Sequence, residues 1–77
     1  MPKKSLSASF AKVLKQERVA KGLSQEQLAH RAGLHRTYIG LLERGLRTPT
    51  LDAGHAIASA LGVSLSEMVR SAEKRPR

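Results

Sequence analysis

Glycines divide this chain into short segments, and their spacing limits the folds it can adopt. Gly22, Gly33, Gly45 and Gly62 each end a segment whose apolar residues recur at helical spacing. Glycine often ends a helix because it adopts the left-handed conformation at no steric cost. No alternating run of apolar and polar residues is long enough to propose a strand. The sequence therefore predicts an all-α fold, a compact bundle of five helices.

The bounds of these helices follow from the glycines and from the polar residues that precede each apolar face. We expect helices at residues 9–21, 24–32, 35–44, 50–61 and 64–71. Ser24 with Gln27, and Ser64 with Glu67, have the spacing of a capping box, which fixes the start of a helix. Gly54 lies inside the fourth segment, where it either costs about 1 kcal/mol against alanine or allows another helix to approach closely.

The length of the chain leaves room for one domain. A chain of 77 residues is too short to build a second core, because even one fold of this size buries only about 60% of the unfolded surface. Residues 1–8 and 72–77 are polar and basic, so we expect a flexible arm and a tail on either side of a domain at 9–71. The absence of cysteine excludes disulfides and cysteine-based zinc sites.

The charge of the chain indicates a polyanionic partner. Fourteen lysines and arginines against six acidic residues give a net charge of +8. With only Phe10 and Tyr38 as aromatic residues, the stacking platforms of RNA and single-strand binders are lacking, which favours duplex DNA. No segment approaches the roughly 20 apolar residues of a membrane-spanning helix, and no signal peptide is recognisable. We therefore expect a cytoplasmic, nucleoid-associated protein without a membrane partner.

Residues 22–49 place glycines, helix caps and charges at the spacing that a DNA-reading pair of helices requires. Their sequence, GLSQEQLAHRAGLHRTYIGLLERGLRTP, is similar to Cro and phage-repressor (XRE) domains, and the resemblance extends through LGVSLSEMV. RTYIGLLERGLRTPTL is also similar to controller proteins of restriction-modification systems, a subgroup of that family. The resemblance implies a lambda-repressor-like fold with a helix-turn-helix at about residues 24–45. It also implies a transcriptional regulator that binds duplex DNA sequence-specifically.

Candidate base-reading residues lie at the start of the third expected helix. A recognition helix reaches base edges with its N-terminal residues, in a groove about 12 Å wide. Arg36 suits guanine, and Thr37 suits a hydrogen bond or a thymine methyl. We assign base reading to these two, with Leu41 and His35 as lesser candidates. The alternatives are an ordinary solvated arginine at Arg36 and peripheral packing at Leu41.

The resemblance places phosphate contacts at the start of the second helix, within the third, and just after it. The residues at these positions are Gln25, Tyr38, Arg44, Arg47 and Thr48. Gln25 lies in a first helical turn, where exposed N–H groups and the helix dipole favour phosphate; its alternative role is that of a surface helix former. Tyr38 has the alternative of packing its ring against the preceding helix.

Two further sets of residues are expected to hold the molecule together. Arg18 and Glu43 match an ion pair between the first and third helices of the family, the alternative being two separate solvated charges. One short recognition helix reads too few base pairs to select a genomic site, so we expect a homodimer on a palindromic operator. Leu65, Met68 and Val69 form an apolar strip for its interface, unless they fold back on the first and fourth helices.

Other classes of function have less support in the sequence. His30, His35 and His55 lie on separate segments without a nucleophile or carboxylate at a recognised spacing. We therefore expect no enzyme, no metal, no cofactor and no small-molecule ligand. The remaining alternative is a protein-interaction module, such as an antitoxin or a bridging partner of another protein. The basic residues around Arg36 and Arg44 argue against this alternative.

Overall fold

The computed structural model describes residues 5–74, so the basic residues at 1–4 and 75–77 lie outside the described part of the chain. The described residues form α1 (Leu6–Ala20), α2 (Gln25–Ala32), α3 (Arg36–Glu43), α4 (Leu51–Leu61) and α5 (Leu65–Lys74). They contain no strand, and the predicted all-α fold of five helices is confirmed. None of these helices is long and apolar enough to cross a membrane.

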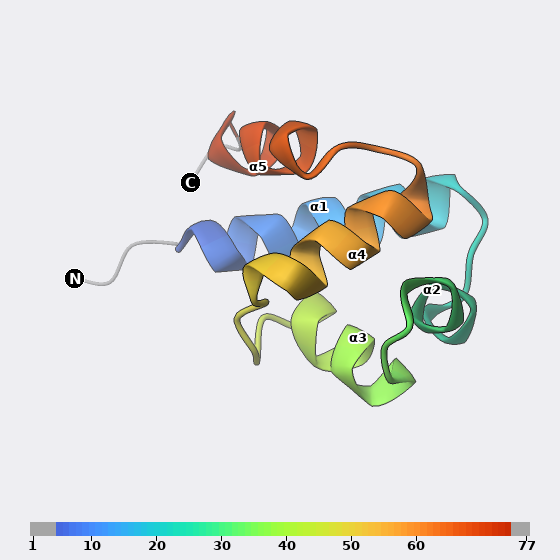
Figure 1. The fold of residues 1–77 in the computed structure, drawn as a ribbon. Helices are drawn as coiled ribbons and strands as arrows, with labels where there is room; N and C mark the ends of the chain where they lie inside the picture. The colour runs from blue at the N-terminus through green and yellow to red at the C-terminus, as the bar shows by residue number, and fades with distance from the viewer. Residues whose placement is uncertain (1–4, 75–77) are drawn as a thin grey trace.

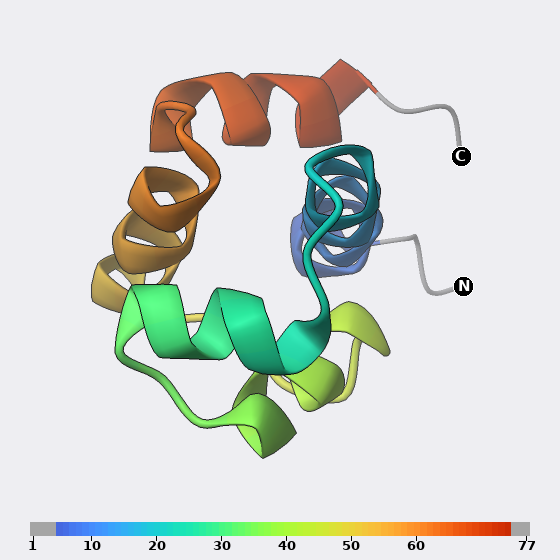
Figure 2. The same ribbon diagram turned by 90° about the vertical axis from the view of Figure 1, so that its right-hand side faces the viewer.

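The helices are arranged around a common centre. Helices α1 and α5 lie side by side, and the short helices α2 and α3 lie together on the side of α1 away from α5 (Figure 1). Seen along α1, the helices form a closed ring in which α4 connects the α2 and α3 pair to α5 (Figure 2). Each helix therefore has one face toward the centre of the domain.

The core draws on all five helices. The largest fully buried side chains are Leu14, Leu28, Ile39, Leu42, Ile57 and Met68. Burying a side chain of this kind contributes about 1.5–3 kcal/mol to stability. Because α2 and α3 anchor three of these residues in the same core as α1, α4 and α5, the two short helices are held rigidly by the rest of the domain.

Local hydrogen bonds fix where the helices begin. Ser24 Oγ accepts from the Gln27 N–H at 3.0 Å, and Gln27 Oε1 accepts from the Ser24 N–H at 2.9 Å. The same pair of bonds joins Ser64 and Glu67, at 3.1 and 3.3 Å. Both predicted capping boxes are thus confirmed, and Gly33, with φ of 70°, ends α2 as expected.

Two helices extend beyond their predicted bounds. Helix α1 begins at Leu6, three residues earlier than predicted, because Ser5 caps it: Ser5 Oγ accepts from the backbone N–H of Ala8 at 3.0 Å. Helix α5 continues to Lys74, because Ala72 is buried in the core rather than part of a tail. The folded part of the chain is therefore longer at both ends than the sequence indicated.

Gly54 allows two helices to approach closely. A Cβ atom at this position would lie 3.3 Å from Leu65 Cδ1, a separation tighter than ordinary van der Waals contact. The second interpretation of this glycine is therefore the correct one. It places the first turn of α5 directly against α4, on the side of the domain where α1 begins.

Candidate nucleic-acid interface

The α2 and α3 pair forms a helix-turn-helix. Each helix has eight residues, and only Gly33, Leu34 and His35 separate them. A connection this short holds the second helix at a steep angle to the first. The two views of the ribbon agree with this arrangement, with α3 at the surface of the domain on the side away from α5 (Figures 1 and 2).

The first turn of α3 presents polar side chains to solvent. Arg36 and Thr37 are exposed, while Ile39 and Leu42 on the other face of the helix are buried. His35 is the N-cap residue and is exposed, but its side chain makes no capping hydrogen bond. The three predicted base-reading residues at this end therefore share one exposed turn on a helix that the core holds in place.

Leu41 and Tyr38 lie between the exposed and buried faces of α3. Both residues are partly buried. Tyr38 packs against the core cluster. A rim position of this kind leaves part of each side chain at the surface that also carries Arg36 and Thr37.

The loop after α3 carries the predicted cationic phosphate ligands. Arg44 is the C-cap of α3 and Gly45 follows with φ of 73°. The chain then turns back, because the Leu46 N–H donates to the Leu41 carbonyl at 2.9 Å. Arg44, Arg47 and Thr48 are all exposed. This hydrogen-bonded turn fixes the backbone from which the two arginine side chains extend.

Arg18 and Glu43 join α1 to the end of α3. Arg18 Nε donates to Glu43 Oε2 at 2.6 Å, and Nη2 donates to Oε1 at 3.1 Å. Arg18 Nη1 also donates to the Leu23 carbonyl at 2.7 Å. The side chains are 12% and 2% exposed, so this pair is far less solvated than a surface ion pair. It fixes both the loop before α2 and the last residue of α3.

Gln25 belongs to the same group of hydrogen bonds. Its Nε2 donates to Glu43 Oε1 at 3.0 Å. The sequence indicated Gln25 as a phosphate ligand or a surface helix former, and no pattern could reveal a contact between residues 18 positions apart on different helices. The start of α2, the end of α3 and the last turn of α1 therefore meet at a single carboxylate.

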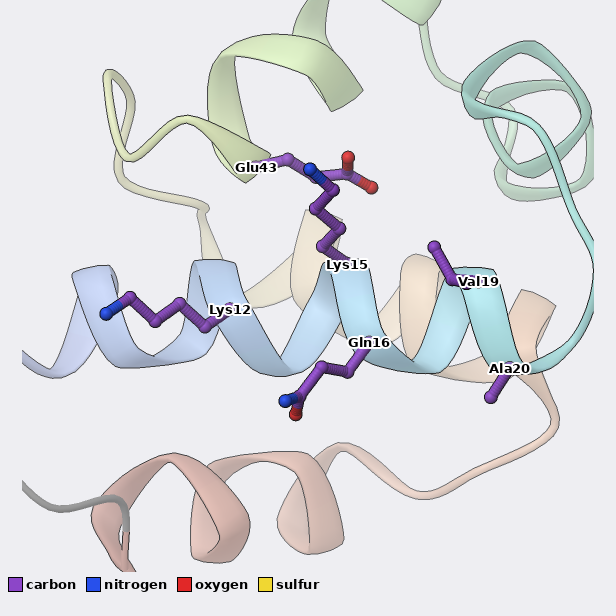
Figure 3. Close-up of a pocket in the computed structure, with 6 residues that line it drawn as sticks. All are labelled: Lys12, Lys15, Gln16, Val19, Ala20 and Glu43. Carbon is purple, nitrogen blue, oxygen red and sulfur yellow. The ribbon is translucent and has the colours of Figure 1, made fainter.

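Lysines of α1 border this carboxylate. A shallow groove beside Glu43 is lined by Lys12, Lys15, Gln16 and Val19. In Figure 3, Lys15 extends from α1 toward Glu43, whereas Lys12 lies one turn nearer the N-terminus of α1 and points away from Glu43. The positive charge of the helix-turn-helix therefore continues onto α1.

The apolar strip predicted on α5 requires a correction. Met68 is only 2% exposed and belongs to the core, because the face of α5 that carries it packs inward. Leu65 and Val69 are partly buried and line an apolar groove together with Leu6 and Leu51. The last two are 49% and 81% exposed, and no motif in the sequence marked them as interface residues. Leu6 lies one helical turn before Phe10 and extends the apolar face of α1. This spacing was the one sequence signal that could have indicated its place in the groove.

Comparison with known proteins identifies the family. Residues 14–68 match the helix-turn-helix family. The chain belongs to this family. The match covers α2, α3 and α4 in full, together with the second half of α1 and the start of α5. It therefore includes the two helices that form the candidate interface.

Individual relatives of this helix-turn-helix protein include controller proteins of restriction-modification systems. Control protein C.BamHI of Bacillus amyloliquefaciens is 43% identical over 61 residues, which is 78% of this chain and 75% of the relative. An uncharacterized HTH-type transcriptional regulator of Sinorhizobium fredii, y4dJ, is 36% identical over 74 residues, 96% of this chain and 91% of the relative. The crystal structure of the restriction-modification controller protein C.AhdI from Aeromonas hydrophila superposes with a TM-score of 0.78 at 42% identity, covering 80% of this chain and 94% of that one. The predicted resemblance is confirmed.

The family is one of transcription regulators rather than enzymes. Within residues 5–74, no three histidine, aspartate or glutamate side chains gather at a point where they could hold a metal ion. The described part of this helix-turn-helix protein offers a polar, basic surface for a partner.

Proposed function

We propose that this helix-turn-helix regulator binds duplex DNA with α3 in the major groove. The observation that carries the proposal is the exposed first turn of α3, with Arg36 and Thr37 on the surface and Ile39 buried behind them. A helix fixed in this way can insert its N-terminal side chains into a groove without losing its own packing.

Base reading and phosphate binding are divided between different elements. Arg36 forms a bidentate contact to guanine and Thr37 a contact to the neighbouring base, with His35 and Leu41 at the edges of the readout. Phosphates are bound by Gln25 at the start of α2 and by the loop that holds Arg44, Arg47 and Thr48. Tyr38, whose ring packs against the core, contributes its hydroxyl to the same backbone.

The regulator acts as a homodimer on a palindromic operator in the cytoplasm. One eight-residue helix contacts too few base pairs to select a genomic site. The exposed Leu6 and Leu51 line one apolar groove with Leu65 and Val69, and this groove forms the surface against which a second copy packs. A two-fold axis through this surface would require half-sites about 34 Å apart.

Gel retardation of labelled duplex DNA tests the proposal. We expect retardation at low salt that survives an excess of random-sequence competitor when the probe carries the operator. Fragments selected from a random duplex pool would supply that operator, and they should share an inverted repeat. If the folded protein retards no duplex at low salt, the proposal is wrong and a protein-interaction role takes its place.

A further inference from the structure

The carboxamide of Gln25 is held across the middle of α3. Its Nε2 donates to Glu43 Oε1 at 3.0 Å. Its Oε1 lies on the other side, 3.5 Å from the place that a Cβ atom of residue 40 would occupy. The carboxamide therefore packs beside Gly40, at the distance of ordinary contact with a Cβ atom there. The side chain bridges from α2 to α3 instead of extending into solvent.

Glu43 is itself fixed from a third helix. Its two carboxylate oxygens accept from Arg18 Nε and Nη2 at 2.6 and 3.1 Å, and Oε1 also accepts from Gln25. The Glu43 side chain is 2% exposed. Rotation of the carboxylate would break bonds to both partners at once, so Glu43 presents a fixed acceptor to the Gln25 amide.

We propose that Glu43 is a positioning residue for phosphate binding by Gln25. An amide nitrogen carries two hydrogens, and one of them is used on Glu43. The other is thereby directed away from Glu43 and donates to a DNA phosphate. Fixing the rotamers of a glutamine before binding avoids an entropic cost that a mobile side chain would incur on the DNA. This inference rests on the proposed DNA-binding function.

Gly40 is the second position on which the arrangement depends. An alanine there would place its Cβ in ordinary contact with Gln25 Oε1, at 3.5 Å. A valine would add two methyl groups beside that Cβ and displace the carboxamide from Glu43. The ion pair between Arg18 and Glu43 does not involve residue 40, so this substitution separates the effect on Gln25 from any loss of the pair.

The test is a double-mutant cycle between Gly40→Val and Gln25→Ala, with Gly40→Ala as the matched control. Affinity for operator DNA and for random duplex is measured in all variants and in the wild type. We expect Gln25→Ala and Gly40→Val each to lower the affinity of both complexes about tenfold, because each substitution removes one hydrogen bond to a charged phosphate. The double variant should be no weaker than either single variant, and Gly40→Ala should bind like the wild type.

Two further measurements distinguish this role from a merely structural one. Gln25 is neutral, so its loss should leave the salt dependence of affinity unchanged, whereas loss of an arginine contact lowers it. In the unbound protein, the NMR signals of the Gln25 amide should show one protected hydrogen. Gly40→Val, which displaces the carboxamide, and Glu43→Ala, which removes the acceptor, should both remove that protection. Circular dichroism confirms that each variant is folded.

The possible failures are separable. If the wild type does not bind DNA, the proposed function itself is wrong. If the wild type binds but the effects of Gly40→Val and Gln25→Ala add in the double variant, the valine acts on the DNA directly and the positioning role is wrong. The positioning role is also wrong if Glu43→Ala, which removes the acceptor oxygen, leaves the Gln25 signals unchanged.

Discussion

The ion pairs Arg18–Glu43 and Lys21–Glu17 differ in their surroundings, and they should differ in energy. Arg18 and Glu43 are 12% and 2% exposed, whereas Lys21 and Glu17 are 41% and 36% exposed at a distance of 3.0 Å. Removing one partner of a buried pair leaves an unpaired buried charge, which costs about 3 kcal/mol. An exposed helical pair contributes only about 0.3–0.5 kcal/mol.

We therefore expect Arg18→Ala to lower the free energy of unfolding by about 3 kcal/mol, while Lys21→Ala changes it by no more than about 0.5 kcal/mol. Urea denaturation followed by circular dichroism measures both. Equal effects of the two substitutions would mean that the Arg18 and Glu43 pair is solvated like a surface pair.

Arg36 and Arg47 should have distinguishable effects on DNA binding. Loss of a bidentate contact to guanine costs about 1–3 kcal/mol on the preferred site and much less on random duplex. Arg36→Ala is therefore expected to relax base preference. Arg47→Ala should weaken all sequences alike and lower the log–log salt slope by about one. Competition assays on matched and mismatched sites measure both effects. An equal loss of affinity for the two sites after Arg36→Ala would mean that Arg36 contacts a phosphate instead of a base.

The candidate site divides into residues that local sequence predicts and residues that it does not. Arg36 and Thr37 could be predicted as surface residues because they lie in the first turn of the helix that follows Gly33. In the structure both are exposed. Met68 and Leu51 have similar apolar character, yet one is 2% and the other 81% exposed. Which apolar residue is covered depends on how distant helices pack, and no local pattern contains that information.

Helix α3 lacks the side-chain N-cap that its neighbours have. Ser24, Thr50 and Ser5 each cap a helix through a side-chain oxygen, whereas His35 makes no such bond. An eight-residue helix is too short to be stable on its own, so α3 relies on the core contacts of Ile39 and Leu42. A missing cap therefore matters more here than in a long helix.

We expect His35→Ser to raise the free energy of unfolding by about 1 kcal/mol, because it supplies the missing cap. Ser24→Ala should lower it by a similar amount, because it removes an existing cap. Thermal unfolding of the two variants and the wild type gives both values. A His35→Ser variant that is no more stable would indicate that the first turn of α3 is already satisfied by water.

The helices themselves were largely predictable because their ends depend on neighbouring residues. Capping boxes and glycines act over three or four positions, which a sequence displays directly. The start of α1 was missed because two serines compete: Ser5 caps the helix, while Ser9, the predicted start, is buried within it. The end of α5 was missed because the burial of Ala72 depends on packing against other helices.

The assembly of the molecule can be tested at Leu51. This side chain is 81% exposed beside the apolar groove, so replacing it with a charged residue should not disturb the core. We expect Leu51→Glu to give a folded monomer with weakened operator binding, since a charge would be buried in the contact between copies. Sedimentation and circular dichroism measure the two properties.

Val19→Glu is the matched control. Val19 is also exposed, at 59%, but it lies on α1 in the groove near Glu43 rather than beside Leu51. This variant should sediment like the wild type. A Leu51→Glu protein that remains dimeric would place the interface on another face of the domain.

The shared carboxylate of Glu43 also constrains how this sequence can diverge. A single change at position 43 removes the partner of an arginine on α1 and of a glutamine on α2. In a lineage that replaces this acid with a neutral residue, selection should therefore weaken at position 18 and at position 25 at the same time. Positions 18, 25 and 43 are expected to covary as a trio among related regulators, whereas the exposed Lys21 and Glu17 pair should drift independently.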